Sequence, residues 1–381
     1  MNHYYLLAKT QAGLEGVLAD ELRQLGATGI RELKRAVAFE GDKRLLYRAN
    51  YELRTALRIL VHLHEFDAFS ERDLYDAVRD VDWSLYMGIK DTLAVDAVIS
   101  GEVFRHSKYA SLLAKDAVVD QFRDRFNSRP NVQQLSPNLR IHIHIQGTSG
   151  NILLDASDEP LFKRGYRKET VDAPMNEVLA AGLVKLSGWN GLGPFVDPMC
   201  GSGTIPIEAA LIARNIPVQF KRNHFGFLRW PDADTDLWKD IKEEAEKRIA
   251  PFEHTILASD IDGRARNTTA MNVVSAGLEN DIRIEKIAFE KLTAPDGLPG
   301  TLIANPPYDE RMLVDDTAAF YRSIGDRFKK NWAGWNAWLI SSNREALKQV
   351  GLRPSKRITL FNGALECSFQ KFEMYEGRKP E

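Results

Sequence analysis

The feature that most constrains the fold is an apolar run that ends in two prolines. Residues 301–304 (Thr-Leu-Ile-Ala) predict a buried parallel strand, and Pro306 and Pro307 cannot continue a hydrogen-bonded ladder. The chain must therefore leave the sheet at Asn305, and ligands of open α/β sheets bind at such strand ends. Because the prolines fix φ, the Asn305 side chain and the Pro306 carbonyl form a pre-set pair of acceptors beside Tyr308, a stacking face. This tip suits an amine donor, and a stiff loop without chemistry is the alternative.

A second motif lies upstream, at residues 195–204. A short strand there leads through a Gly-Ser-Gly turn into a helix at 205–213, and free amides at a helix start favour a carboxylate. The turn lacks the G-x-G-x-x-G of dinucleotide folds, and Asp197 before it suits the amino group of a methionine moiety. The next strand, 255–259, ends at Asp260, which is placed to hold two ribose hydroxyls. The residues therefore favour a cofactor other than a dinucleotide.

The two motifs resemble motifs IV and I of the amino-methyltransferases that use S-adenosylmethionine, enzymes that act on exocyclic amines of bases or on glutamine amides. The resemblance covers residues 165–381 and implies a Rossmann-like domain with a seven-stranded mixed sheet that ends in an antiparallel pair. It implies catalytic roles for Asn305, Pro306, Pro307 and Tyr308. The cofactor-binding residues that it implies are Asp197, Met199, Gly201, Ser202, Gly203, Thr204, Asp260, Ile261, Asn305, Arg167 and Pro174. S-adenosylmethionine is then the cofactor, and no metal is required.

One position departs from the pattern of these methyltransferases. Many of them have an Asp after the third strand to hold the adenine amine, whereas this chain has Ala288-Phe289-Glu290. We expect backbone groups and apolar contact to hold the adenine instead. Glu290 is therefore left out of the candidate site.

Before this domain the sequence predicts two small α/β modules. Residues 1–65 have the strand and helix patterns of a split β-α-β, ferredoxin-like lobe. Residues 66–160 contain a strand at 92–99, a long helix that Ser107 is predicted to cap, and an alternating strand at 139–145. This second module resembles the THUMP domain, an RNA-binding unit found beside such a lobe in several RNA-modifying enzymes.

Basic residues in and after this module are the candidate RNA contacts. They are Arg105, His106, Lys108, Lys115, Lys163 and Arg164. Lys163 and Arg164 belong to a basic stretch around Gly165-Tyr166, which suits phosphate contact with an aromatic neighbour. A solvated helix face that binds no RNA is the alternative for Arg105, Lys108 and Lys115.

His142 and His144 lie on the polar face of the 139–145 strand. Two histidines alone do not complete a metal site, and no further ligand lies near them in the sequence. We therefore expect both to be solvated strand positions, and we expect no metal site.

The composition bounds the class of protein. A chain of 381 residues with 44% hydrophobic and 27% charged residues is typical of a globular protein of two or three domains. The net charge of −2 argues against a uniformly basic nucleic-acid binder but permits a local basic face. Cys200 and Cys367 are too few for a disulfide framework or a cysteine zinc site. With no apolar run of about 18 residues and no secretory signal, we expect a cytoplasmic protein without a membrane partner.

The whole chain is predicted to be α/β, with a ferredoxin-like lobe at 1–65, a THUMP domain at 66–160 and a methyltransferase domain at 161–381. This order of modules resembles the THUMP-containing guanine-N2 RNA methyltransferases, including those of bacterial 23S ribosomal RNA. The resemblance implies methyl transfer to the exocyclic N2 amine of a guanosine in 23S ribosomal RNA. The alternatives are a transfer RNA guanosine, a protein glutamine amide, or an inactive RNA-binding protein. The sequence does not fix the RNA, the nucleotide or the oligomeric state.

Overall fold

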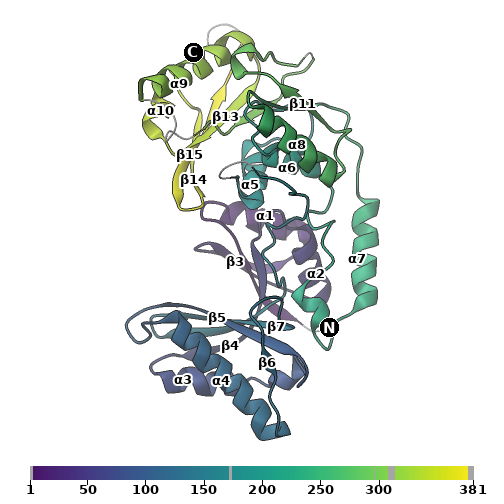
Figure 1. Cartoon of the computed structure of the whole chain (residues 1–381), viewed down its shortest axis with the longest axis vertical. Helices are drawn as coiled ribbons and strands as arrows, with labels where there is room; N and C mark the ends of the chain where they lie inside the picture. The colour runs from purple at the N-terminus through teal and green to yellow at the C-terminus, as the bar shows by residue number, and fades with distance from the viewer. Residues whose placement is uncertain (1–2, 171–173, 296, 308–313, 376–381) are drawn as a thin grey trace. The chain divides into compact units, whose positions relative to one another are not determined.

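The computed structural model describes residues 3–170, 174–295, 297–307 and 314–375 (Figure 1). The chain forms two compact units, each with its own sheet. The first unit consists of Met1–Thr10, Ala19–Leu161 and Arg222–Glu244. The second unit consists of Gln11–Leu18, Phe162–Lys221 and Ala245–Glu381. Each unit thus contains one short segment that the sequence places among the residues of the other.

The first unit contains an eight-stranded sheet with the strand order β2-β3-β1-β4-β8-β7-β5-β6. Its strands are β1 (Tyr4–Lys9), β2 (Thr28–Leu33), β3 (Ala36–Gly41), β4 (Arg58–Asp67), β5 (Thr92–Ser100), β6 (Asn131–Val132), β7 (Leu139–Gln146) and β8 (Ser149–Asp155). Its helical elements are α1 (Glu15–Leu25) from Ala19 onward, α2 (Lys43–Glu52), α3 (Glu71–Asp80), η1 (Trp83–Leu85), α4 (Ser107–Phe126), η2 (Gly226–Arg229) and α7 (Thr235–Lys247) as far as Glu244. The strands predicted at 92–99 and 139–145 are confirmed as β5 and β7.

The ten-residue strand β4 joins the two modules that the sequence separated. It pairs antiparallel with β1, where Arg58 is opposite Lys9, and with β8, where Leu60 is opposite Asp155. The boundary suggested at residues 65 and 66 falls inside this strand. Sequence reasoning missed β4 because three successive buried residues follow Arg58 and the next three positions are all half-buried, so neither strand pattern runs through the strand.

Residues 222–244, called the arm from here on, pack in the first unit although they lie between two elements of the methyltransferase sequence. Phe227 stacks on Tyr47 with ring centroids 4.0 Å apart, and Trp238 meets Tyr51 edge-on at 5.1 Å. Aromatic pairs of this kind add about 0.5–1.5 kcal/mol each beyond the area that they bury. The arm therefore packs with the first unit, although it lies within the sequence span 161–381 predicted for the methyltransferase domain.

The second unit contains a seven-stranded sheet with the strand order β11-β10-β9-β12-β13-β15-β14. Its strands are β9 (Phe195–Asp197), β10 (Ile256–Asp260), β11 (Ile282–Lys286), β12 (Thr301–Ala304), β13 (Asn336–Ser341), β14 (Lys356–Asn362) and β15 (Leu365–Glu373). Its helical elements are α5 (Glu177–Ser187), α6 (Thr204–Ala213), α8 (Gly263–Ala276), η3 (Phe289–Lys291), α9 (Val314–Asn331) and α10 (Arg344–Lys348). Only β15 runs antiparallel to its neighbours β13 and β14 within this sheet as described. The predicted mixed sheet with its terminal antiparallel pair is confirmed.

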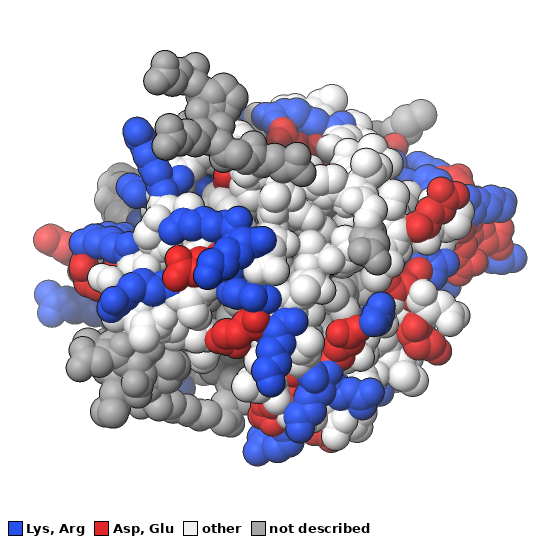
Figure 2. Space-filling view, turned by 90° about the horizontal axis from the view of Figure 1, so that it is seen from above, with Lys and Arg blue, Asp and Glu red and all other residues white. Residues whose placement is uncertain are grey.

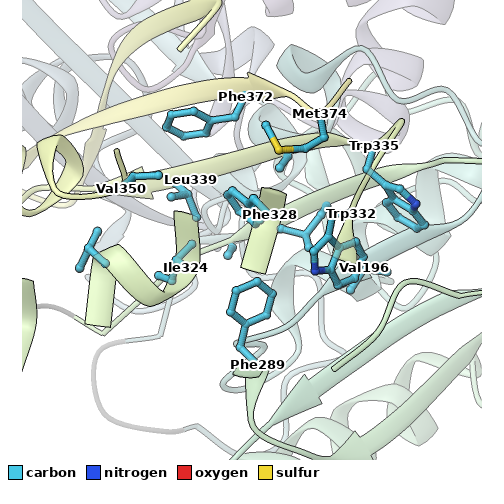
Figure 3. Close-up of a cluster of buried hydrophobic side chains, with 14 of the residues drawn as sticks. Val196, Phe289, Ile324, Phe328, Trp332, Trp335, Leu339, Val350, Phe372 and Met374 are labelled. Carbon is cyan, nitrogen blue, oxygen red and sulfur yellow. The ribbon is translucent and has the colours of Figure 1, made fainter. Parts of the chain in front are cut away.

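One face of this second sheet is covered by a cluster of large apolar side chains (Figure 3). Tyr321, Ile324 and Phe328 recur at helical spacing and give α9 its buried stripe. Phe289 of η3 stacks on Trp332 with centroids 6.3 Å apart. Fully burying a side chain of this size contributes about 1.5–3 kcal/mol. Phe289 is therefore part of the apolar core of the second unit.

Candidate functional site

Three neighbouring strands of the second unit end at one edge of its sheet. Strands β10, β9 and β12 are adjacent and parallel, so their last residues lie side by side. Asp260 ends β10, Asp197 ends β9, and Asn305 follows directly after β12. We call this the carboxyl edge, defined by Asp197, Asp260 and Asn305. The two predicted motifs are thus brought together by the order of the strands.

Asp197 is a buried acid with few partners. It is 1% exposed and accepts one hydrogen bond from the Met199 amide at 3.2 Å. Burial raises the pKa of Asp197 to about 8, with a further contribution from the negative charge of Asp260. No cation lies within 4.0 Å of its carboxylate among the residues described. A desolvated carboxylate in this setting favours a cationic ligand, because a nearby positive charge stabilises its ionised form.

Asp260 is held in place by the backbone on both sides. Its Oδ2 accepts from the Gly201 amide at 3.0 Å, and its Oδ1 accepts from the Asp262 amide at 2.9 Å. A carboxylate has about four acceptor positions, so two remain for a ligand's hydroxyl groups. The backbone contacts thus orient the carboxylate and leave it capacity to bind a diol.

The glycine turn before α6 fits closely against α8. Gly203 has a φ of +80°, and a Cβ at that position would lie 2.8 Å from Cγ2 of Thr269. Thr269 donates from its hydroxyl to the Gly201 carbonyl at 2.9 Å. Any side chain at 203 would therefore be strained by its φ and would collide with α8, so the turn keeps its backbone open to a ligand.

Arg167 forms hydrogen bonds that link residues 175–177 to this turn. Its guanidinium donates to Ser202 Oγ and Thr204 Oγ1, both at 3.0 Å, and also to the Met175 carbonyl at 3.0 Å. Its Nε donates to the Glu177 carboxylate at 2.8 Å. Arg167, predicted as a cofactor contact, thus has four protein acceptors, and in this structure it ties residues 175–177 to the turn.

Asn272 is a residue near the turn that sequence reasoning missed. It is fully buried, and its Oδ1 accepts from the Lys168 and Glu169 amides at 2.8 and 3.2 Å. Its Nδ2 donates to the Ser202 and Glu169 carbonyls at 2.9 and 3.0 Å. An amide with all four positions filled fixes the local backbone. The sequence feature that could have identified it is an Asn among the residues that form the buried side of α8.

The remaining predicted cofactor and catalytic residues are placed unevenly. Asn305 is half-buried, Pro306 is buried and Pro307 is exposed, while Tyr308 lies outside the described residues. Ile261 follows Asp260 and is 69% exposed, and such an apolar surface is available for the predicted cofactor contact. Pro174 is exposed, and Met199 packs partly against the apolar cluster of the second unit.

The predicted RNA contacts differ in their exposure and in their surroundings. Arg105, His106 and Lys108 are exposed at the start of α4, and Lys163 is exposed in the second unit. Lys115 forms an ion pair with the neighbouring Asp116.

Arg164 requires a correction. It is 1% exposed, and its Nε lies 3.5 Å from the buried Glu208, which also accepts from the Tyr166 hydroxyl at 3.1 Å. An Arg buried against a carboxylate is unavailable to phosphate, so this burial argues against its predicted contact with RNA.

The two histidines of β7 are also not the solvated positions that were expected. His142 lies 3.1 Å through its Nε2 from the buried Asp155 carboxylate, which also pairs with Arg58. His144 is half-buried, and burial with the nearby charge of Lys9 lowers its pKa. Among the described residues no group of three or more His, Cys, Asp or Glu side chains is placed to hold a metal. The described helices include none that is long and apolar enough to span a membrane.

Comparison with known proteins assigns the chain to a family. Residues 164–371 match the family described as RMKL-like, methyltransferase domain. The chain belongs to this family. Residues 5–60 of this RMKL-like chain match the RlmL ferredoxin-like domain, and residues 68–155 match the THUMP domain. The predicted family, module types and their order are confirmed.

Curated relatives of this RMKL-like chain are named as ribosomal RNA large subunit methyltransferase K/L. The protein from Syntrophotalea carbinolica is 38% identical over 382 residues, which cover 97% of this chain and 54% of that protein. The protein from Methylococcus capsulatus is 38% identical over 377 residues, which cover 96% and 51%. The chain thus spans about half the length of these relatives. A solved structure, SMU.472, described as a methyltransferase complexed with SAH, is 28% identical with a TM-score of 0.90, covering 99% of this chain and 100% of that one.

Proposed function

We propose that this RMKL-like chain is an S-adenosylmethionine-dependent RNA methyltransferase that modifies the exocyclic N2 amine of a guanosine in 23S ribosomal RNA. The observation that carries the proposal is the carboxyl edge, where Asp197, Asp260 and Asn305 follow three neighbouring strands. The names of the two curated relatives support ribosomal RNA as the substrate, and the THUMP match supports RNA over a protein amide.

The residues at the carboxyl edge fit S-adenosylmethionine. Asp197, buried and without a cation within 4.0 Å among the described residues, would receive the ammonium of the methionine moiety. Asp260 would accept from the ribose hydroxyls with the positions that its two backbone bonds leave free. Gly201 and Gly203, with φ of +55° and +80°, would keep the turn open to the methionine carboxylate. When bound, the cofactor supplies an electrophilic methyl group on a sulfonium.

The chain's own contribution to the chemistry is to position the target amine. Asn305 and the Pro306 carbonyl would accept hydrogen bonds from the amine, because the two prolines fix the direction of both acceptors. This orientation would turn the amine's lone pair away from conjugation with the ring and toward the methyl group. The guanosine must leave its stack to reach this edge, and Tyr308 is the proposed stacking partner.

The proposal is tested by separating chemistry from cofactor binding. In Asn305→Ala we expect single-turnover methylation of 23S ribosomal RNA from cells lacking this protein to fall at least about a hundredfold, by analogy with the loss of one oriented polar group at a reacting centre. S-adenosylmethionine affinity by calorimetry should stay within about a few-fold. Asn280→Ala, on an exposed position away from the edge, is the matched control and should change neither. Methylation by folded Asn305→Ala near the wild-type rate would contradict the assignment.

A further inference from the structure

A cluster of cations lies at the end of the second unit's sheet opposite to the carboxyl edge. Strand β13 begins there, with Asn336 opposite Thr301 of β12 and opposite Glu373 at the end of β15. Strand β14 also begins there, with Lys356 opposite Lys371. The end of α9 joins them, because Lys329 Nζ lies 3.9 Å from the position of a Cβ on Gly351. We define the basic edge as Lys329, Lys330, Arg353, Lys356, Arg357 and Lys371.

The basic edge is more positive than the protein as a whole. Residues 321–375 contain ten Lys and Arg against four Asp and Glu, in a chain whose net charge is −2. Figure 2 looks from above onto the side where Figure 1 draws α9, and Lys and Arg side chains gather over part of this face with fewer acidic ones between them. A local excess of this kind attracts polyanions at a distance.

Four members of the basic edge are exposed and have no acidic partner in the part of the chain that the structure describes. Lys330, Arg353, Lys356 and Arg357 have no carboxylate within 4.0 Å among the described residues. The other two are paired, since Lys329 lies 3.7 Å from an Asp326 oxygen and Lys371 lies 2.8 Å from a Glu373 oxygen. The four unpaired cations are therefore not used by ion pairs of the fold.

Stability of the fold explains only part of this set. Lys330 complements the negative end of the α9 dipole, and cations on the outermost strand β14 discourage pairing with another chain. Arg353 has neither role, because it lies between the end of α10 at Lys348 and the start of β14 at Lys356. A set that extends over a helix end, a connection and a strand start is better matched to a continuous anionic ligand.

We propose that the basic edge binds phosphates of the substrate RNA outside the target nucleotide, an inference that rests on the proposed RNA methyltransferase function. The six residues of β13 separate the two edges by about 20 Å at about 3.3 Å per residue, so a target nucleotide at the carboxyl edge cannot reach the basic edge. Only RNA that extends from the target along the protein can contact both edges. Sequence reasoning had assigned RNA recognition to residues before 165, and this surface adds a second contact within the methyltransferase unit.

The test is the salt dependence of RNA affinity in the full chain. The variant Lys330→Gln, Arg353→Gln, Lys356→Gln and Arg357→Gln removes the four unpaired cations. Its affinity for an unmodified 23S ribosomal RNA transcript, measured by filter binding over a salt series, should fall. The slope of log K against log salt should decrease in magnitude by about 3, since each lost phosphate contact removes about 0.7–0.9. Calorimetric S-adenosylmethionine affinity should not change.

Two controls separate phosphate contact from charge in general. One neutralises four exposed cations that each face a carboxylate, Lys239, Arg283, Arg344 and Lys348, and should leave the slope within about 1 of wild type. The other control keeps the charges, with Lys330→Arg, Arg353→Lys, Lys356→Arg and Arg357→Lys. Its slope should equal that of the wild type. Unchanged slope in the four-Gln variant, or an equal decrease in it and in the paired-cation control, would overturn the proposal while leaving the proposed function intact. Wild-type protein that neither binds nor methylates the RNA would instead overturn the proposed function.

Discussion

Asp155 and Asp197 are both aspartates at the end of a strand, and each is 1% exposed, yet their surroundings are opposite. Burial pushes the pKa of Asp155 upward, but His142, Arg58 and the Ser157 amide together bring it below its ordinary value. Burial raises the pKa of Asp197 to about 8, because one amide is too little to offset desolvation and Asp260 adds repulsion. The difference teaches that a buried acid marks a ligand site only where the fold leaves out the countercharge.

The largest expected effect is on the free energy of unfolding, and it follows from a change at Asp155, whose carboxylate is paired with His142 and Arg58. Asp155→Asn should lower the free energy of unfolding of the full chain by about 3 kcal/mol, because it leaves the largely buried Arg58 without its counter-ion. Urea unfolding measures this loss. Asp197→Asn is the matched variant and should cost less than about 1 kcal/mol, since an amide replaces a group that is mostly protonated at pH 7. Equal destabilisation by the two changes would remove the distinction between the sites.

The second expected effect is on cofactor binding at Asp197. Asp197→Asn should weaken S-adenosylmethionine binding by about a hundredfold, because a charge-assisted contact to the ammonium is lost. Calorimetry on the folded variant measures it. The control is Asp281→Asn in the same unit, whose carboxylate lies 2.9 Å from Arg214 and should affect stability without changing the affinity. An unaltered affinity in Asp197→Asn would exclude Asp197 from the cofactor site.

The smallest expected effect concerns Asp260, the other acid of the carboxyl edge. Its carboxylate already accepts two backbone hydrogen bonds. Asp260→Ala should weaken S-adenosylmethionine by about ten- to a hundredfold, since two hydrogen bonds to the ribose are lost. Two backbone amides also lose their acceptor, so the Gly201 turn should loosen. Affinity for 5′-methylthioadenosine, which keeps the ribose and lacks the amino acid, should fall in Asp260→Ala and be unaffected in Asp197→Asn. The reverse result would exchange the roles of the two acids.

Sequence reasoning succeeded where a local sequence pattern determines the secondary structure. The strands before Asp197, Asp260 and Asn305 are short apolar runs, and parallel topology alone brings their ends together. It failed for Arg164, because an Arg in a basic stretch is expected at the surface unless a buried carboxylate is known to pair with it. That partner, Glu208, lies on the buried face of α6.

The arm shows a second limit of reasoning from local pattern. No local pattern indicates that Phe227 and Trp238 pack against Tyr47 and Tyr51 of the first unit. A fragment of residues 161–381, the span predicted for the methyltransferase domain, would carry this arm without its aromatic partners. It would also lack residues 11–18, which belong to the second unit. Experiments on cofactor binding should therefore use the full chain.

The central claim is that no described residue gives Asp197 a countercharge and that the cofactor supplies one. It is tested most directly by proton release on binding. With a pKa of about 8, Asp197 is protonated in the free protein at pH 6.5, and it must ionise to pair with an ammonium that is itself still protonated there. Calorimetry of S-adenosylmethionine binding at pH 6.5 in buffers of different ionisation enthalpy counts the protons. At pH 6.5 we expect release of about one proton per chain in the wild-type protein and none in Asp197→Asn. Wild-type binding at pH 6.5 without proton release would contradict the account.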